Sequence, residues 1–538
     1  MAMWSLKGKK ILIIDDYGEM RSMLRKMLSG YSADDITSVA TGEEAIDMIG
    51  NKRFDIILCD YNLGDGKDGQ QVLEEVKYRG YLSYSTLFIM ITAESTSFMV
   101  MGALEYQPDE YLSKPVTATV LQARLQKLME KKEGLHALAK ALENKNHLKV
   151  IELCDQQIAA NPRNRLELLK LKCEQLLELK QFDAAREICN SVLAERDIPW
   201  ASMALGKLHL FNKEYDEAQI LFESVIAANG AYVAAYDWLA RLHMERGDHA
   251  TAQQVLHKAV TWSPKSVLRQ RALADASEQN NDLTTAEEAR KKAIRIGKNS
   301  VLRQASDYAN LAKTLMKGDN AKEALRYVDL IKHEFKNDNE ARLTAALAKE
   351  KIYRDTGQES RSAEAAQEAL EIFAQLPAIS SSELAMELTA ACLAHGKGEE
   401  ANRVVQQLVN NNHNNEALLQ QISALYKESG QEGAANALVT QVRKEMIATN
   451  NRGVELLNSG KVEESVGFFE QALGSAPFNP QLNINTAQSY LVLMKRRGGD
   501  ETLLQKVRHS LDIASNEAKL QERCQLLNKL YWEIANGG

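Results

Sequence analysis

The sequence predicts two parts of different fold class, a doubly wound α/β domain at residues 1–132 and an all-α superhelical solenoid at residues 133–538. Short apolar runs alternate with amphipathic stretches in the first part, as buried strands alternate with helices around a parallel sheet. In the second part strand signals disappear, and Ala, Leu, Glu, Gln and Lys dominate with helical periodicity. Alanines recur there at a spacing of 34 residues, which is typical of stacked helical repeats.

In the first part, the apolar runs Ile11–Ile14, Ile56–Cys59 and Leu87–Ile91 are expected to be strands buried on both faces. Ligand sites of such sheets lie at the carboxyl ends of the strands, so the residues after each run are the candidate functional residues. Amphipathic stretches that predict helices between the strands lie at residues 20–28, 42–49 and 70–78.

In the second part, Ala184, Ala218, Ala252 and Ala286 follow one another at intervals of 34 residues. One helical unit of this length cannot bury its apolar face alone, so successive units are expected to stack. We expect about ten units and a C-terminal capping helix. The expected irregularities are poor phasing between residues 340 and 400 and Ser465 in place of a repeat alanine.

Composition narrows the function classes. The net charge of −7, with both parts mildly acidic, lacks the basic footprint of a nucleic-acid-binding protein. No apolar run approaches the length of a membrane span or of a secretory signal, so we expect neither membrane insertion nor export. The six cysteines form no Cys-x-x-Cys pair, which argues against a zinc site or a disulfide framework and favours the cytoplasm.

Acidic, hydroxyl and amino side chains stand where the expected strands end. Asp15 and Asp16 follow the first run, Asp60 ends the second, and Thr92 ends the third. Lys114 comes later, directly before a proline. Carboxylates that are brought together repel one another, and a divalent cation relieves that repulsion. Mg²⁺ suits such a site because it is bound by one or two carboxylates, waters and phosphate oxygens.

This ordered set resembles the receiver domain of two-component response regulators over about residues 8–130, and the 34-residue repeat resembles the tetratricopeptide repeat. The first resemblance implies a flavodoxin-like sheet. It also implies that Asp60 is the phosphoacceptor. Asp16 and Asp60 would bind Mg²⁺ directly together with the backbone carbonyl of Asn62, and Asp15 would bind it through a water.

The same resemblance assigns roles at the remaining strand ends. Thr92 would hydrogen-bond the transferred phosphoryl group, and Lys114 would form an ion pair with it. Tyr111 occupies the position of the rotating aromatic switch residue, and the Lys114–Pro115 bond is expected to be cis. The face formed by the fourth helix, fifth strand and fifth helix is expected to transmit the change.

The sequence departs from the receiver pattern in the loop after Asp60. Gly64 stands where the family usually has a proline, and the segment from Gly64 to Gly69 is about one residue longer than usual. Both changes bear on the rigidity of this loop and on the rate of dephosphorylation. No chemical group of the site is missing, so the sequence predicts a competent receiver.

The predicted function is a cytoplasmic response regulator of a phosphorelay that uses its repeats to bind protein partners in a phosphorylation-dependent way. Apart from catalysing its own phosphotransfer and dephosphorylation, it is not expected to be an enzyme. The expected partners are a histidine kinase or phosphotransfer protein, a protein or peptide ligand in the repeat groove, and a second copy that pairs through the receiver. First-helix side chains line such grooves, and the phasing selects Trp200, Lys207, Asp237, Arg241, Arg271 and Lys313.

Three alternatives differ in what the repeats do. A DNA-binding transcriptional regulator would use them for oligomerisation or sensing, but it needs a helix-turn-helix and a basic patch that the sequence lacks. An enzymatic output would need a phosphate-binding glycine loop or clustered acids in the second part, and neither is present. A phosphate sink would function without residues 133–538.

Overall fold

The chain divides into two compact units, Met1–Asp307 and Tyr308–Gly538, which are described separately. The first unit contains the α/β domain together with the first helical hairpins. The predicted boundary at residue 132 falls near the end of a helix that runs from Ala118 to Glu133, and it stays a prediction. The computed structural model describes residues 4–93, 108–133, 136–160, 164–376, 378–430, 432–498 and 500–535.

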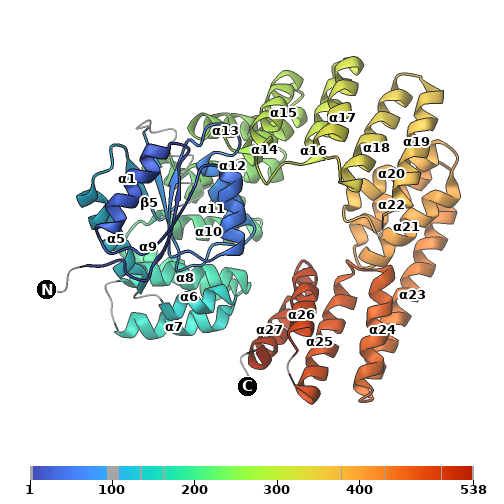
Figure 1. Ribbon diagram of the computed structural model, residues 1–538. Helices are drawn as coiled ribbons and strands as arrows, with labels where there is room; N and C mark the ends of the chain where they lie inside the picture. The colour runs from blue at the N-terminus through green and yellow to red at the C-terminus, as the bar shows by residue number, and fades with distance from the viewer. Residues whose placement is uncertain are drawn as a thin grey trace. The chain divides into compact units, whose positions relative to one another are not determined.

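A five-stranded parallel sheet forms the centre of the α/β domain (Figure 1), and this confirms the predicted fold class. The strand order is β2-β1-β3-β4-β5, the doubly wound order in which the chain reverses direction beside β1 and β3. The strands are β1 Lys10–Ile14, β2 Asp35–Val39, β3 Ile56–Asp60, β4 Leu87–Thr92 and β5 Glu110–Ser113.

Alternate strand residues supply two separate cores, because successive side chains of a strand point to opposite faces. Leu12 and Ile14 pack on one face with α2 and α3, whereas Ile11 and Ile13 pack on the other with α1 and α5. Both faces are therefore covered, as the continuous apolar runs predicted. The helices are α1 Gly18–Ser29, α2 Gly42–Asn51, α3 Gly69–Tyr78 and α5 Ala118–Glu133.

Every element described after α5 is helical, and successive helices pair as hairpins. None of the helices in the described part of the chain combines the length and the apolarity that a bilayer crossing requires. The helices up to residue 297 are α6 His136–Glu143, α7 His147–Ala160, α8 Arg165–Glu178, α9 Phe182–Glu195, α10 Pro199–Phe211, α11 Tyr215–Ala228, α12 Val233–Arg246, α13 His249–Trp262, α14 Val267–Gln279 and α15 Leu283–Gly297.

The remaining helices continue the same pattern, with one exception. The helix α23, Glu432–Asn458, has 27 residues, about twice the length of its neighbours, and it packs against both α22 and α24. The others are α16 Ala305–Lys317, α17 Ala321–Glu334, α18 Asn339–Asp355, α19 Glu359–Phe373, α20 Ser382–Ala394, α21 Gly398–Asn412, α22 Glu416–Glu428, α24 Val462–Ser475, α25 Pro480–Arg497, α26 Glu501–Ala514 and α27 Gln521–Ala535, preceded by the short helix η2 Ala518–Leu520.

One small, fully buried residue recurs at the fourth position of the second helix in nine of the described hairpins, and its size lets neighbouring helices pack closely. The sequence phasing placed the first of these at Ala184, and this was wrong by one residue. Ala185 is the fully buried alanine of α9, while Ala184 is only half-buried. The buried set is Ala185, Ala218, Ala252, Ala286, Ala324, Ser362, Ala401, Ala435 and Ser465.

The segment between residues 340 and 400 retains the hairpins even though its sequence loses the 34-residue phase. The helix α18 has 17 residues, against 13 or 14 in α10 and α12, so the next small residue comes late. That residue is Ser362, and its Oγ donates a hydrogen bond to the carbonyl of Glu350 at 3.2 Å. A search for repeating alanines could not find it, because both the spacing and the residue type change.

Replacement of Ala252 by leucine is expected to lower the free energy of unfolding by about 1–3 kcal/mol, because extra methylene groups in a close-packed core force neighbouring helices apart. Chemical denaturation followed by circular dichroism measures the change. The matched control is Ala250→Leu, which adds the same atoms to an exposed position of the same helix. Equal effects of the two substitutions would contradict the close approach described here.

Candidate functional site

Three carboxylates meet at the carboxyl edge of the sheet. Asp15 and Asp16 follow β1, and Asp60 is the last residue of β3, its neighbour in the sheet. One carboxylate oxygen from each residue lies within 4.8 Å of those of the other two. Asp15 and Asp60 are buried, with 1% and 7% of their surfaces exposed, whereas Asp16 is exposed. The parallel register therefore gathers the acids that the sequence predicted as one site.

Lys114 supplies a positive charge to this cluster from the end of β5. Its Nζ lies 3.0 Å from Oδ1 of Asp60 and 3.2 Å from Oδ2 of Asp15, so it bridges the two buried acids. Burial by itself would lower the pKa of Lys114, but the hydrogen bond and charge of Asp60, reinforced by Asp15, raise it above the usual value. The Lys114–Pro115 peptide bond is cis, which confirms the expectation from sequence.

Asp60 is held in an environment that disfavours its charge. Burial and repulsion from Asp15 and Asp16 raise the pKa of Asp60 to about 6, although Lys114 acts in the opposite direction. One cation therefore does not neutralise three carboxylates. This uncompensated negative charge, together with an all-oxygen donor set, fits a hard divalent cation such as Mg²⁺. Asp16 and Asp60 are placed to hold such an ion, and Asp15 lies beside them.

Backbone contacts fix the orientation of these acids. The Tyr17 amide donates to Oδ1 of Asp15 at 2.8 Å, and the Tyr61 amide donates to Oδ1 of Asp60 at 3.0 Å. The Arg21 guanidinium donates to the backbone carbonyls of Asp15 at 2.6 Å and Asp16 at 3.0 Å. Sequence reasoning missed Arg21, because a helical arginine carries no sign that it will turn back to the strand end.

The remaining predicted site residues occupy the same edge. Thr92 is buried at the end of β4, beside β3, and Asn62 is exposed two residues after Asp60. Tyr111 lies in β5, and its hydroxyl is buried with no hydrogen-bond partner among the described residues. Burial raises the pKa of the Tyr111 phenol well above its ordinary value. The expected fourth helix of the readout face falls within residues 94–107, outside the described residues.

The loop between β3 and α3 lies against the acidic cluster. Gly64 and Gly66 adopt φ values of +72° and +99°, a region that side chains other than glycine rarely enter. A Cβ atom on Gly64 would lie 3.2 Å from Oδ2 of Asp16, and one on Gly69 would lie 2.1 Å from the Asp60 carbonyl oxygen. These glycines therefore allow the loop to approach the acids, which explains the departure from the proline expected at position 64.

Five of the six predicted groove residues fall into two groups. Three of them form ion pairs within the chain: Asp237 with Arg269 at 2.7 Å, Arg271 with Asp307 at 2.6 Å, and Lys313 with Glu387 at 2.5 Å. The first two pairs connect one hairpin to the next, and the third connects α16 to α20. The three residues therefore have structural contacts besides any role toward a partner.

The other group consists of Lys207 on α10 and Arg241 on α12, which both lie beside the aromatic ring of Trp238 on α12. The Nζ of Lys207 lies 4.8 Å from the ring centroid of Trp238, and Cζ of Arg241 lies 5.1 Å from it. Burial lowers the pKa of Lys207. Half of the surface of Phe211 is exposed beside the same ring. Trp200 instead packs into the apolar contacts of α8 and α9 and is half-buried.

Comparisons with known proteins agree with this geometry. A family model for the response regulator receiver domain matches residues 11–126, and a model for the tetratricopeptide repeat matches residues 209–276. The chemotaxis protein CheY of Pseudomonas aeruginosa is 29% identical over 125 residues, which are 23% of this chain and 99% of that protein. The chemotaxis protein CheY-3 of Vibrio cholerae is also 29% identical over 125 residues, covering 23% of this chain and 95% of that protein.

Solved structures show likeness to the same N-terminal segment. The crystal structure of a CheY-like response regulator receiver domain protein from Methanospirillum hungatei is 26% identical, covering 23% of this chain and 97% of that chain, with a TM-score of 0.22. The receiver domain of Francisella response regulator 1452 is 22% identical, covering 23% of this chain and 98% of that chain, with a TM-score of 0.21. The receiver family model identifies residues 11–126 as a response regulator receiver domain, and the repeat model shows that the helical region after it contains tetratricopeptide repeats.

Proposed function

We propose that this chain is a phosphorylation-controlled adaptor of the cytoplasm. Its receiver accepts a phosphoryl group on Asp60 from a histidine kinase or phosphotransfer protein, and its repeats bind protein partners according to that state. The observation that carries the proposal is the position of the Asp60 carboxylate, which lies 3.0 Å from Lys114 within a cluster of two further acids. No residue type that phosphotransfer to an aspartate requires is missing from this cluster.

The proposed reaction is a single displacement at phosphorus. A carboxylate oxygen of Asp60 attacks the phosphorus in line, a P–O bond forms, and the P–N bond of the phosphohistidine breaks. The electron pair of that bond leaves with the imidazole, which takes up a proton. One negative charge on Asp60 becomes roughly two. Lys114, already in contact with Asp60, offsets part of this charge, and a bound Mg²⁺ would supply further charge neutralisation.

The proposed switch uses Thr92 and Tyr111, which lie on the two strands next to β3 on one side of the sheet. Thr92 at the end of β4 would donate a hydrogen bond to a phosphoryl oxygen, and Tyr111 would move into the space that Thr92 leaves. The Tyr111 hydroxyl has no hydrogen-bond partner in the described part of the chain, which supports this role, because such a group has little polar contact to lose when it moves.

For the output, we propose that the side chains of Lys207, Phe211, Trp238 and Arg241 form part of the partner surface. Two cations beside the half-buried ring of Trp238 and the half-exposed ring of Phe211 favour a peptide that carries carboxylates next to an apolar residue. We also propose that two receivers pair, which would be a further way to transmit the phosphorylation state to the repeats.

Incubation of the full chain with Mg²⁺ and acetyl phosphate is expected to add one acid-labile phosphoryl group at Asp60, which intact-protein and peptide mass spectrometry can locate. Asp60→Asn is expected to abolish it. The matched control is Asp65→Asn, because Asp65 is an exposed acid of the adjoining loop. Unchanged modification of Asp60→Asn would refute the assignment.

Mg²⁺ binding is expected to weaken by roughly 10–100-fold in Asp15→Asn, because removal of an outer-sphere partner typically has that effect on a metal site. Asp16→Asn should weaken it at least as much, since this residue is proposed to bind the ion directly. Titration calorimetry measures both affinities, with Asp65→Asn again as the control. Equal affinities in all three variants would show that the ion binds elsewhere.

Arg241→Ala is expected to reduce the amount of partner that the phosphorylated full chain captures, because it removes a cation beside the Trp238 ring. Quantitative mass spectrometry would compare wild-type bait, with and without acetyl phosphate, with Asp60→Asn bait. Arg196→Ala, at an exposed position that follows α9, serves as the control. A set of captured proteins that is identical in every arm would contradict a phosphorylation-dependent adaptor.

A further inference from the structure

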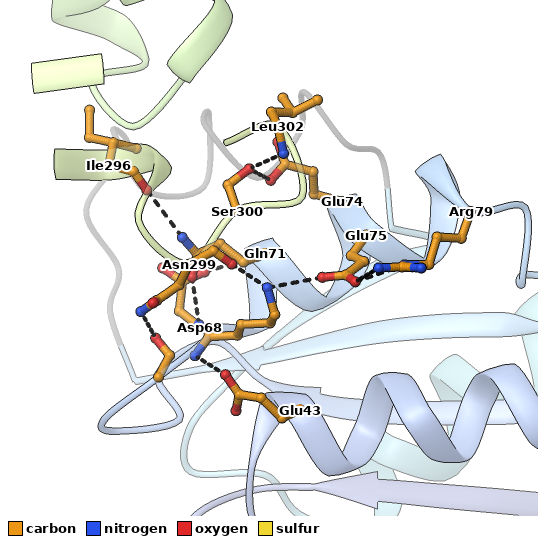
Figure 2. Close-up of polar contacts among 12 residues, drawn as sticks. Glu43, Asp68, Gln71, Glu74, Glu75, Arg79, Ile296, Asn299, Ser300 and Leu302 are labelled. Atoms are coloured by element: carbon orange, nitrogen blue, oxygen red, sulfur yellow. Dashed lines mark hydrogen bonds and ion pairs between the residues drawn. The ribbon is translucent and has the colours of Figure 1, made fainter. Parts of the chain in front are cut away.

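Two turns between successive repeats lie against the receiver within the first unit. One turn carries Lys265, between α13 and α14, and the other carries Asn299 and Ser300, between α15 and α16. Figure 2 shows the second turn above α3 and the loop that precedes it. This loop joins the phosphoacceptor strand to α3, so the repeats contact the receiver beside its reactive residue.

Hydrogen bonds tie the second turn to the loop itself. The side-chain amide of Asn299 donates to the Gly66 carbonyl at 2.6 Å, and the Lys67 ammonium donates in return to the Asn299 carbonyl. At the first turn, Lys265 forms an ion pair with Asp68 at 3.1 Å, and its Nζ lies 5.1 Å from the ring centroid of Tyr61. The loop is therefore held at its middle and at its end.

A second set of contacts secures α3. Ser300 donates a hydrogen bond to the Glu74 carboxylate at 2.6 Å, and both residues are buried. Gln71 donates to the Ile296 carbonyl at 3.4 Å. Glu74 and Glu75, with 7% and 5% of their surfaces exposed, are consecutive acids that a free surface helix would leave in water. Glu74 is covered through its hydrogen bond to Ser300 of the repeats, whereas Glu75 is paired within the receiver, with Lys67 at 2.9 Å and Arg79 at 2.8 Å. The burial of Glu74 indicates that the repeats cover this part of α3.

The loop needs such support. It contains two glycines in left-handed conformations and lacks the proline that would stiffen it, so its free backbone has an unusually large entropy to lose on ordering. Asn62, whose carbonyl is the expected third protein ligand of Mg²⁺, lies in this loop, two residues before Gly64. A ligand on a mobile segment binds more weakly, because the ordering cost is subtracted from the binding free energy.

We infer that the repeat turns act as a positioning clamp for the metal site, with Asn299 and Ser300 as positioning residues that hold the β3–α3 loop in the geometry that binds Mg²⁺. The receiver thus obtains from the repeats the loop rigidity that other sequences would obtain from proline. The contacts described above are the basis for the clamp itself. Its effect on phosphorylation rests on the proposed function.

Coupling of this kind is reciprocal. If docking of the turns strengthens Mg²⁺ binding at Asp60, then Mg²⁺ binding must strengthen docking by the same factor. A partner that pulls the two turns away from α3 would weaken the metal site, and a loaded metal site would oppose that partner. The clamp therefore gives a direct route between the receiver and the repeats that does not pass through the fourth helix, fifth strand and fifth helix.

The test uses the full chain with Asn299→Asp, which keeps the side-chain shape but replaces the donor to Gly66 with a carboxylate. We expect the dissociation constant for Mg²⁺ to rise about fivefold. Amide hydrogen exchange at residues 62–69 should also accelerate, whether or not Mg²⁺ is present. The control is Asn281→Asp, the same change at an exposed turn position whose left-handed backbone aspartate tolerates.

Ser300→Ala, which removes the hydrogen bond to Glu74 on α3, should also raise the dissociation constant for Mg²⁺. Ser300→Thr, which keeps the hydroxyl, should leave the dissociation constant close to that of the wild type. Wild-type Mg²⁺ affinity in Asn299→Asp would overturn the inference, including the case in which exchange alone accelerates, since the contact would then be only structural. The failure of the proposed function is distinguishable. If acetyl phosphate does not modify the wild-type chain, but Asn299→Asp still lowers the affinity for Mg²⁺, the clamp is supported and the proposed phosphorylation is contradicted.

Discussion

The contact of Lys114 with Asp60 and Asp15 is the interaction on which the receiver site depends. It joins the end of the edge strand β5 to the ends of β1 and β3. It also places an ammonium group beside two buried carboxylates, which would otherwise repel each other more strongly. The compensation is incomplete, because burial still raises the pKa of Asp60 to about 6. An incompletely neutralised acidic cluster is suited to hold a divalent cation.

The repeats depend on a different constraint, the close approach of neighbouring helices. Nine second helices place a fully buried alanine or serine at their fourth position, and this contact is kept even where the helix lengths change. At Ser362 and Ser465 the hydroxyl donates to a backbone carbonyl, so the polar group is satisfied inside the core. Stacking thus tolerates insertions in the first helix, and the solenoid continues through the segment where its sequence pattern fails.

Sequence reasoning predicted the fold class, the strand ends and the residues of the acidic cluster, because each follows from local patterns. Apolar runs show the strands, and a parallel sheet brings their carboxyl ends to one edge. Local sequence patterns could not predict contacts between segments far apart in the chain. Arg21 turning back to the strand end, Asn299 on the Gly66 carbonyl and the burial of Glu74 all depend on tertiary packing, and none has a local pattern.

The phasing error at Ala184 has a similar origin. Two adjacent alanines, Ala184 and Ala185, both fit a repeat, and only the packing of α9 distinguishes the buried one. The loop after Asp60 is a different case. Its glycines and the absence of proline were visible in the sequence, but their meaning became clear only when the structure showed which external residues hold the loop.

The most direct measurement of the central claim is an experimental structure of the full chain with Mg²⁺ and beryllium fluoride, a stable mimic of the phosphoryl group. We expect the fluoride complex on the Asp60 carboxylate, within hydrogen-bond distance of Lys114 and Thr92, and the metal ion between Asp16 and Asp60. A fluoride complex bound elsewhere, with the Asp60 carboxylate still paired only to Lys114, would contradict it.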